Sequence, residues 1–152
     1  MTGPGPQGRR AMDTLPFHIP FERICVGDSA SITVDITQRL IGDYAVFIGD
    51  RDSFHLSPGL NAATPYARQT CQGSLLLGYF SLLAAQKLPG FGAVLCKMEA
   101  DFEKPVYLGD RITFWIAVAK KYDRRRLLLE AKASNQQGVC CICGNLVIKT
   151  LD

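Results

Sequence analysis

The sequence predicts an α+β fold in which an antiparallel, curved sheet of about five strands wraps around a long apolar central helix. Residues Ser74–Lys87 (SLLLGYFSLLAAQK) are apolar nearly all round, and a helix of that composition has to be buried. Five runs rich in β-branched residues, separated by turn residues, lie on either side of this segment. With 152 residues, the chain suits one domain around a single core.

The first half of the chain predicts one strand, one short helix and one long loop. Ala30–Thr37 (ASITVDIT) alternates and is β-branched, which predicts a strand. Thr37–Ile48 (TQRLIGDYAVFI) has apolar residues at helical spacing, with Thr37 suited to cap the start and Gly49 the end. Asp50–Gly73 is irregular and too long for a simple turn, so we expect a loop with a function.

The second half predicts the central helix followed by four strands. The segment Leu88–Gly90 (LPG) ends the helix. Because the turn-forming segments PVYLGD, KKYDRRR and QQG separate the strands, we expect consecutive strands to pair as an antiparallel meander. The four expected strands are Ala93–Phe102, Arg111–Ala119, Leu127–Asn135 and Val139–Lys149.

Composition and charge narrow the class of protein. Hydrophobic residues make up 47% and charged residues 20%, which predicts a folded globular chain. The net charge of +3 is not gathered into a basic face, so no nucleic-acid partner is expected. Residues 1–14 lack the apolar run of a signal peptide, and no segment is long enough to span a membrane. We expect a flexible tail over 1–14, a single domain over 15–152, no membrane partner and a cytoplasmic location.

The six cysteines are expected to be free thiols, because a reducing compartment disfavours disulfides. The cluster of Cys140, Cys141 and Cys143 has no second CxxC pair to complete a metal site and no neighbouring histidine. In a regular strand, Cys141 and Cys143 would share one face and Cys140 would take the other. We therefore interpret them as small buried hydrophobic residues, and we expect no metal site.

The segment GDRDSFH, Gly49 to His55, holds two carboxylates and one of only two histidines in the chain. Asp50 and His55 meet the same small molecule only if the segment is bent, which Asp52 favours because its side chain can bond to nearby backbone N–H groups. A carboxylate and an imidazole that hold one water molecule could deprotonate it and return a proton. The alternative is a polar loop in which Asp50 caps the backbone and His55 only packs.

Gly73 stands where the central helix is expected to begin. The first N–H groups of a helix have no partner within the helix, and glycine allows close approach of a ligand. A carbonyl oxygen that gains negative charge would be stabilised there, so Gly73 is a candidate oxyanion site. The alternative is that glycine serves close packing alone.

Three segments taken together carry a family resemblance. GD-x-x-x-x-H, then LSPGLNAATPYARQTCQGSLLLGYFSLLAAQKLPGFGAV, then FEKPVYLGDRITF resemble the MaoC-like or (R)-specific enoyl-CoA hydratases, over about residues 24–120. The resemblance implies a single hot-dog fold. It also implies a hydro-lyase that acts on an enoyl or 3-hydroxyacyl thioester of coenzyme A or an acyl carrier protein, without a cofactor beyond the coenzyme A or phosphopantetheine of the substrate.

The family's motifs carry over to particular residues. Asp50 and His55 match the aspartate and histidine that handle water and proton transfer. Gly73 matches the glycine whose backbone N–H binds the thioester oxygen, and Ser81 matches a serine that supports the site. Phe54 and the central helix would border the acyl tunnel.

The chain also departs from the family pattern. Asn-Pro is replaced by Asp52-Ser53, the apolar residue before the histidine is Phe54, and the histidine before the glycine is Gln72, which we group with the substrate-binding residues. The additional carboxylate of Asp52 could raise the pKa of Asp50 or His55. These departures suggest a specialised substrate such as a carrier-bound polyketide intermediate.

Two further hypotheses concern assembly and activity. A single domain of this kind leaves a sheet edge and a helix flank open, so we expect at least a homodimer, as the resemblance also implies. One alternative function is a non-catalytic acyl-binding or assembly subunit. A thioesterase is a weaker alternative, because the central helix carries no acid. Lys120, Lys121 and Arg124 to Arg126 are interpreted as a charged hairpin tip, to which coenzyme A phosphates or an acidic carrier protein could be drawn.

Overall fold

The structure, a computed structural model, describes residues 17–52, 55 and 68–151. The expected tail and most of the expected long loop therefore lie outside the described residues. The described elements are the 3₁₀ turn η1 (Phe21–Arg23), the helices α1 (Gln38–Ile48) and α3 (Gly73–Gln86), and the strands β1 (Ser29–Asp35), β2 (Val94–Phe102), β3 (Arg111–Tyr122), β4 (Arg126–Ser134) and β5 (Cys140–Lys149). The elements predicted from the sequence are confirmed, with β3 running three residues further than expected.

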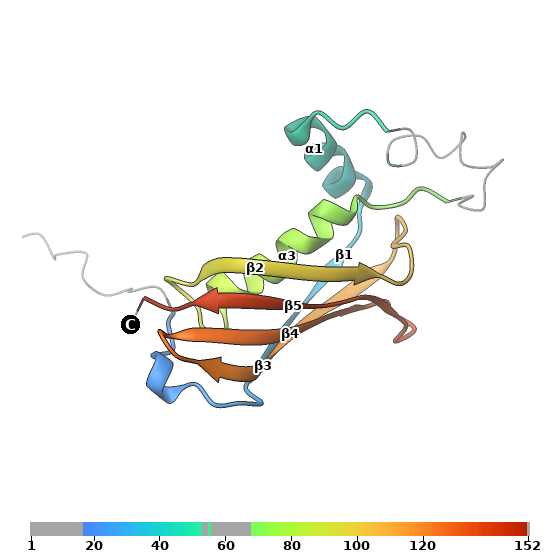
Figure 1. The fold of residues 1–152 in the computed structure, drawn as a ribbon. Helices are drawn as coiled ribbons and strands as arrows, with labels where there is room; N and C mark the ends of the chain where they lie inside the picture. The colour runs from blue at the N-terminus through green and yellow to red at the C-terminus, as the bar shows by residue number, and fades with distance from the viewer. Residues whose placement is uncertain (1–16, 53–54, 56–67, 152) are drawn as a thin grey trace, which may run out of the picture.

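The five strands form one antiparallel sheet in the order β1-β3-β4-β5-β2. Helix α3 runs along one face of this sheet, and α1 lies beyond the sheet end at which α3 begins (Figure 1). The buried side of α3 presents Leu76, Phe80 and Leu83 to the sheet. The ring of Phe80 meets Phe114 of β3 edge-on at 5.3 Å between centroids. The α+β prediction is confirmed, and the position of α3 is fixed by its own apolar surface.

The predicted four-strand meander is wrong in one respect. Strands β3, β4 and β5 pair in sequence order, but β2 pairs with β5 instead of β3. The connection from β2 to β3 is bonded to the segment that precedes α3. The N–H of Leu108 donates to Gln69 O at 2.9 Å, and the N–H of Cys71 donates to Val106 O at 2.8 Å. This connection therefore crosses the end of the sheet in front of α3.

The predicted facing of the cysteines on β5 is also wrong. Ser134 pairs with Cys140 and Ala133 pairs with Ile142, so Cys141 is an additional residue on β5. This β-bulge breaks the alternation of faces. Cys141 is buried, whereas Cys140 and Cys143 are both half-buried with their sulfur atoms 2.7 Å apart.

Helix α1 is capped at both ends as the sequence predicted. The side chain of Thr37 accepts a hydrogen bond from the N–H of Leu40 at 3.1 Å. Gly49 ends the helix in the left-handed region with φ of 75°, which suits glycine because it has no Cβ. The N–H of Asp50 then donates back to Ala45 O at 2.8 Å. These bonds fix the direction in which the chain leaves α1.

The basic hairpin between β3 and β4 lies at the opposite end of the sheet from the C-terminal end of β2. Arg126 pairs with Lys149, which also pairs with Val94 at the start of β2. The side chain of Lys121 is occupied, because it donates to the backbone oxygens of Phe21 and Ile24, each at 2.7 Å.

Within the described ranges, no helix is long and apolar enough to cross a bilayer.

Candidate active site

Asp50 and His55, five residues apart, are brought together as the bent-segment hypothesis requires. Nδ1 of His55 lies 2.8 Å from Oδ2 of Asp50, and the two side chains are 22% and 13% exposed. The bend is closed by the N–H of His55, which donates to Asp52 O at 3.1 Å. The polar-loop alternative does not predict this contact between the two side chains.

Hydrogen bonds hold the Asp50 carboxylate in its ionised form. The N–H of Asp52 donates to Oδ1 at 2.8 Å, while Nε2 of Gln72 donates to Oδ2 at 3.2 Å. The pKa of Asp50 is lowered chiefly by the bond from Asp52, with Gln72 and His55 adding to it and burial opposing it. The expectation that Asp52 raises this pKa is wrong, because Asp52 acts on Asp50 through its backbone N–H.

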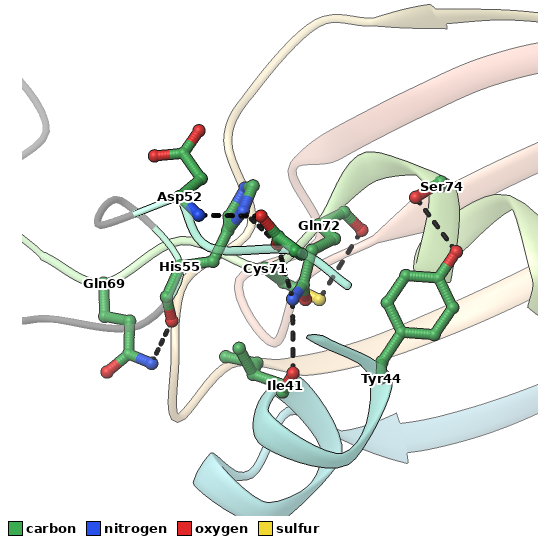
Figure 2. Close-up of polar contacts among 9 residues, drawn as sticks. Ile41, Tyr44, Asp52, His55, Gln69, Cys71, Gln72 and Ser74 are labelled. Carbon is green, nitrogen blue, oxygen red and sulfur yellow. Dashed lines mark hydrogen bonds and ion pairs between the residues drawn. The ribbon is translucent and has the colours of Figure 1, made fainter. Parts of the chain in front are cut away.

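Gln72 lies behind Asp50 rather than on the wall of the cavity. Its side chain is buried, and Nε2 donates both to Asp50 and to Ile41 O, each at 3.2 Å (Figure 2). Its Oε1 is buried and has no hydrogen-bond partner in the described part of the chain. Gln72 thus connects α1, the Asp50 segment and the start of α3. It is a positioning residue in this arrangement.

His55 is held from two directions. Its backbone oxygen accepts a hydrogen bond from Nε2 of Gln69, and its ring contacts Asp50 through Nδ1 (Figure 2). When Nδ1 carries the proton and donates it to the ionised carboxylate, Nε2 is left as an acceptor. An imidazole in this state has the lone pair that a general base needs.

A cavity of about 460 Å³ lies in front of His55. Gly73, the first residue of α3, lines it together with Leu76 of the same helix. The facing wall comes from the end of β2 and the connection that follows, including Phe102 and Val106. His55 and the helix start therefore border one space, with apolar side chains alongside.

The space above Gly73 is tight. A Cβ at this position would lie 2.9 Å from Cε1 of Phe102. Glycine thus lets the Phe102 ring lie close to the first turn of α3, where N–H groups have no partner within the helix. The candidate oxyanion site is bordered by an aromatic ring that the sequence did not single out.

One predicted site residue, Ser81, is not brought into this cavity, and another lies outside the described residues. Ser81 is half-buried on α3, about 12 Å along the axis from Gly73 at 1.5 Å per residue, and it is not part of the cavity lining. Phe54 lies outside the described residues. The roles assigned to both remain predictions.

Sequence reasoning missed Gln69 and the wall formed by residues 102–106. Gln69 is a buried polar residue in a segment interpreted only as loop, and no local pattern distinguishes it from an exposed glutamine. The residues 102–106 were assigned to a strand end and a turn. Their contact with the segment before α3 depends on the crossing connection, which pairing of neighbouring strands does not predict.

Comparisons with known proteins show which sequences and folds this chain resembles. The family model described as MaoC like domain matches residues 27–137. The chain is 30% identical over 125 residues to an (R)-specific enoyl-CoA hydratase from Aeromonas caviae, covering 82% of this chain and 93% of that protein. It is 31% identical over 106 residues to a 3-hydroxybutyryl-CoA dehydratase from Methylorubrum extorquens, covering 70% of this chain and 68% of that protein.

The fold comparison gives the same result. An unliganded R-hydratase from Pseudomonas aeruginosa superposes with a TM-score of 0.84 and 28% identity, over 88% of this chain and 86% of that structure. The hot-dog fold expected from the resemblance is confirmed.

Proposed function

The chain belongs to the MaoC-like domain family, and from this premise we propose that it is a hydro-lyase acting on an enoyl or 3-hydroxyacyl thioester. The observation that carries the proposal is the Asp50–His55 pair, whose imidazole borders the same cavity as the N-terminal end of the buried helix. A base and an oxyanion site facing one space are the two elements that addition of water to a conjugated thioester needs.

In the hydration direction, a water molecule held at Nε2 of His55 attacks the β carbon and gives its proton to that nitrogen. The electron pair of the double bond moves toward the thioester oxygen, which the N–H of Gly73 stabilises as negative charge develops. His55 then returns the proton to the α carbon. Asp50 holds the ring through Nδ1 and stabilises the imidazolium that forms in between. Dehydration follows the same steps in reverse.

The division of labour between Asp50 and His55 follows from their surroundings. The sequence suggested that both side chains contact the water, whereas His55 lines the cavity and Asp50 lies behind it. The lowered pKa of Asp50 keeps its carboxylate ionised near neutral pH, as an orienting group requires. We therefore assign proton transfer to His55 and orientation to Asp50.

We propose coenzyme A as the carrier of the acyl group, because the relatives named above are described as acting on coenzyme A thioesters. The reaction consists of addition and proton transfer, so it calls for no cofactor beyond the coenzyme A or phosphopantetheine of the substrate. A carrier-protein substrate, a polyketide intermediate and the cytoplasmic location remain predictions from the sequence.

The proposal is tested with purified protein, crotonyl-CoA and a 3-hydroxyacyl-CoA, by the change in absorbance of the conjugated thioester. Asp50→Asn and His55→Ala should each lower kcat/KM at least about a hundredfold, which is what a positioned acid or base contributes. A matched control is Asp43→Asn, because Asp43 is exposed on α1 and pairs only with Arg39 among the described contacts. Unchanged rates in both site variants would remove the proposed site.

The same assay separates the alternatives. Hydration and thioester hydrolysis both lower the absorbance of the conjugated thioester, but only hydrolysis releases the free thiol of coenzyme A. Release of free thiol would therefore identify a thioesterase, although α3 carries no acid between Gly73 and Gln86. Binding of the thioester without turnover would identify an acyl-binding subunit.

We also propose that the protein forms a homodimer through the open edge of β2. Of the two edge strands, β1 exposes only small or polar side chains, at Ser29, Ser31, Thr33 and Asp35. Strand β2 exposes the charged side chains of Lys97, Glu99 and Asp101, and in addition the large apolar side chains of Val94, Leu95 and Phe102. An open edge strand that also exposes large apolar side chains is a template for pairing with a second copy of the chain. Leu95→Glu should shift the mass measured by sedimentation from dimer to monomer, whereas Thr33→Glu on β1 should not. A monomeric wild-type protein, or a dimer insensitive to Leu95→Glu, contradicts this.

A further inference from the structure

A pair of thiols lies at the start of β5, outside the candidate active site. The bulge at Cys141 turns Cys140 and Cys143 toward the same side of the strand, where their sulfur atoms are 2.7 Å apart. Both cysteines are free and half-buried. Neither is used in the proposed reaction, because neither lines the cavity.

The surroundings of the pair favour a thiol that is reduced and slow to react. Burial and, after it, the neighbouring Cys143 together raise the pKa of Cys140 to about 11. Since the thiolate is the attacking species, Cys140 alone is a poor nucleophile near neutral pH. The cation of Lys132, which pairs with Cys143 across β4 and β5, lies close enough to both sulfurs to interact with their negative charge.

Cys141, which lies between the two thiols, supports the cavity wall through its backbone oxygen. The backbone oxygen of Cys141 accepts hydrogen bonds from the N–H of Glu103 at 2.9 Å and from the N–H of Lys104 at 3.3 Å. Glu103 and Lys104 both line the cavity in front of His55. The bulge is therefore connected to the candidate active site by two backbone hydrogen bonds.

We propose that Cys140 and Cys143 form a reversible dithiol–disulfide site that adjusts the cavity wall through the carbonyl of Cys141. A low-molecular-weight disulfide such as oxidised glutathione serves as the oxidant. A thiolate of the pair attacks one sulfur of this disulfide and releases one reduced thiol, leaving a mixed disulfide. The second thiol then attacks the protein sulfur of the mixed disulfide and releases the other reduced thiol, so that two electrons and two protons leave the protein. Closure fixes the bulge between the two bonded residues.

The proposal is tested by incubating the purified full-length protein with oxidised glutathione, followed by alkylation of free thiols and peptide mapping. The wild type should yield a Cys140–Cys143 cross-link that dithiothreitol reverses, distinct from the mixed disulfides with glutathione expected at the exposed Cys25 and Cys96. Cys140→Ser and Cys143→Ser should each retain only a mixed disulfide with glutathione. Cys96→Ser is the matched control, because Cys96 is an exposed free thiol on β2, and it should form the same Cys140–Cys143 cross-link as the wild type.

Amide hydrogen exchange measures whether the state of the thiols affects the two hydrogen bonds that connect Cys141 to the cavity wall. Oxidation should change the exchange rates of the Glu103 and Lys104 amides at least about threefold in the wild type and not in Cys140→Ser. The Asp123–Arg125 turn at the other end of the sheet should be unaffected. Absence of the cross-link overturns the site, and a cross-link with unchanged exchange overturns its connection to the cavity. Both readouts are independent of catalysis, so they decide the matter even if the proposed hydro-lyase activity is absent.

Discussion

Replacement of Gln72 by methionine tests whether the buried amide positions and ionises Asp50. Methionine has nearly the same length, so it fills the space but donates no hydrogen bond. The variant loses the bond from Nε2 to Asp50 and the bond to Ile41 O, each at 3.2 Å in the wild type. It also removes the buried Oε1, which has no partner among the described residues.

The expected magnitude follows from these three changes. A hydrogen bond to a charged group contributes about 1.5–3 kcal/mol and a neutral one about 0.5–1.5 kcal/mol, so the variant loses roughly 2–4.5 kcal/mol. Removal of the unpartnered oxygen and burial of apolar surface recover about 1–2.5 kcal/mol. The midpoints of these two ranges differ by about 1.5 kcal/mol, so the free energy of unfolding at neutral pH should fall by about that amount, which lowers Tm by roughly 3–6 °C for a chain of this size.

The pH dependence identifies the charged part of this loss. Because the pKa of Asp50 is lowered in the folded state, its contribution to stability is complete above the unfolded pKa of about 3.9 and is lost as the pH falls through the folded value. In the variant, the pKa of Asp50 is lowered less than in the wild type, because the hydrogen bond from Gln72 is lost. The difference in stability between wild type and variant should therefore be full at pH 7 and should shrink as the pH falls below the unfolded pKa of about 3.9.

Urea denaturation of both proteins at a series of pH values measures this difference directly. Gln69→Met is the matched control, because Gln69 is equally buried but donates to the uncharged backbone oxygen of His55. Its effect on stability should be independent of pH. A Gln72→Met midpoint equal to that of the wild type at pH 7 refutes the reasoning, as does a difference that stays the same from pH 7 down to the lowest pH at which both proteins still fold.

Two other substitutions test the cavity and the fold separately. Gly73→Ala should lower kcat/KM at least about tenfold, because its Cβ would lie 2.9 Å from Cε1 of Phe102. If this clash is the cause, the double variant with Phe102→Ala should recover part of the loss. Purely additive effects of the two substitutions would contradict this explanation. Lys121→Met should lower the free energy of unfolding by about 1–3 kcal/mol, because the ammonium donates to two backbone oxygens, and should leave kcat/KM unchanged. Lys120→Met is its control in urea denaturation, and equal losses for the two would show that the hydrogen bonds contribute little.

The elements that the sequence predicted well are those whose signals are local. Thr37 and Gly49 mark the two ends of α1 by their own chemistry, and the structure places both at the caps. The apolar surface of α3 required burial whatever covered it. Asp50 and His55 were paired in advance because a bend of five residues is also a local property, helped by the family resemblance.

The features that were missed depend on contacts between distant segments. Gln72 was grouped with the substrate-binding residues, but its side chain lies against Ile41 and Asp50, which are 31 and 22 positions away. No pattern around residue 72 specifies those partners. The bulge at Cys141 was missed for a similar reason, because a single additional residue in a strand leaves the apolar sequence of β5 unchanged while it reverses the facing of the cysteines.

The error in strand pairing and the existence of the cavity have one cause. If β2 had paired with β3 through a tight turn, residues 103–110 would have stayed at one sheet edge. Instead, the N–H groups of Leu108 and Cys71 tie this connection to the segment before α3, which carries it across the mouth of the helix. Phe102 and Val106 thereby face Gly73 and close the space in front of His55. The connection that departs from the meander is thus the part of the fold that forms the wall of the proposed active site.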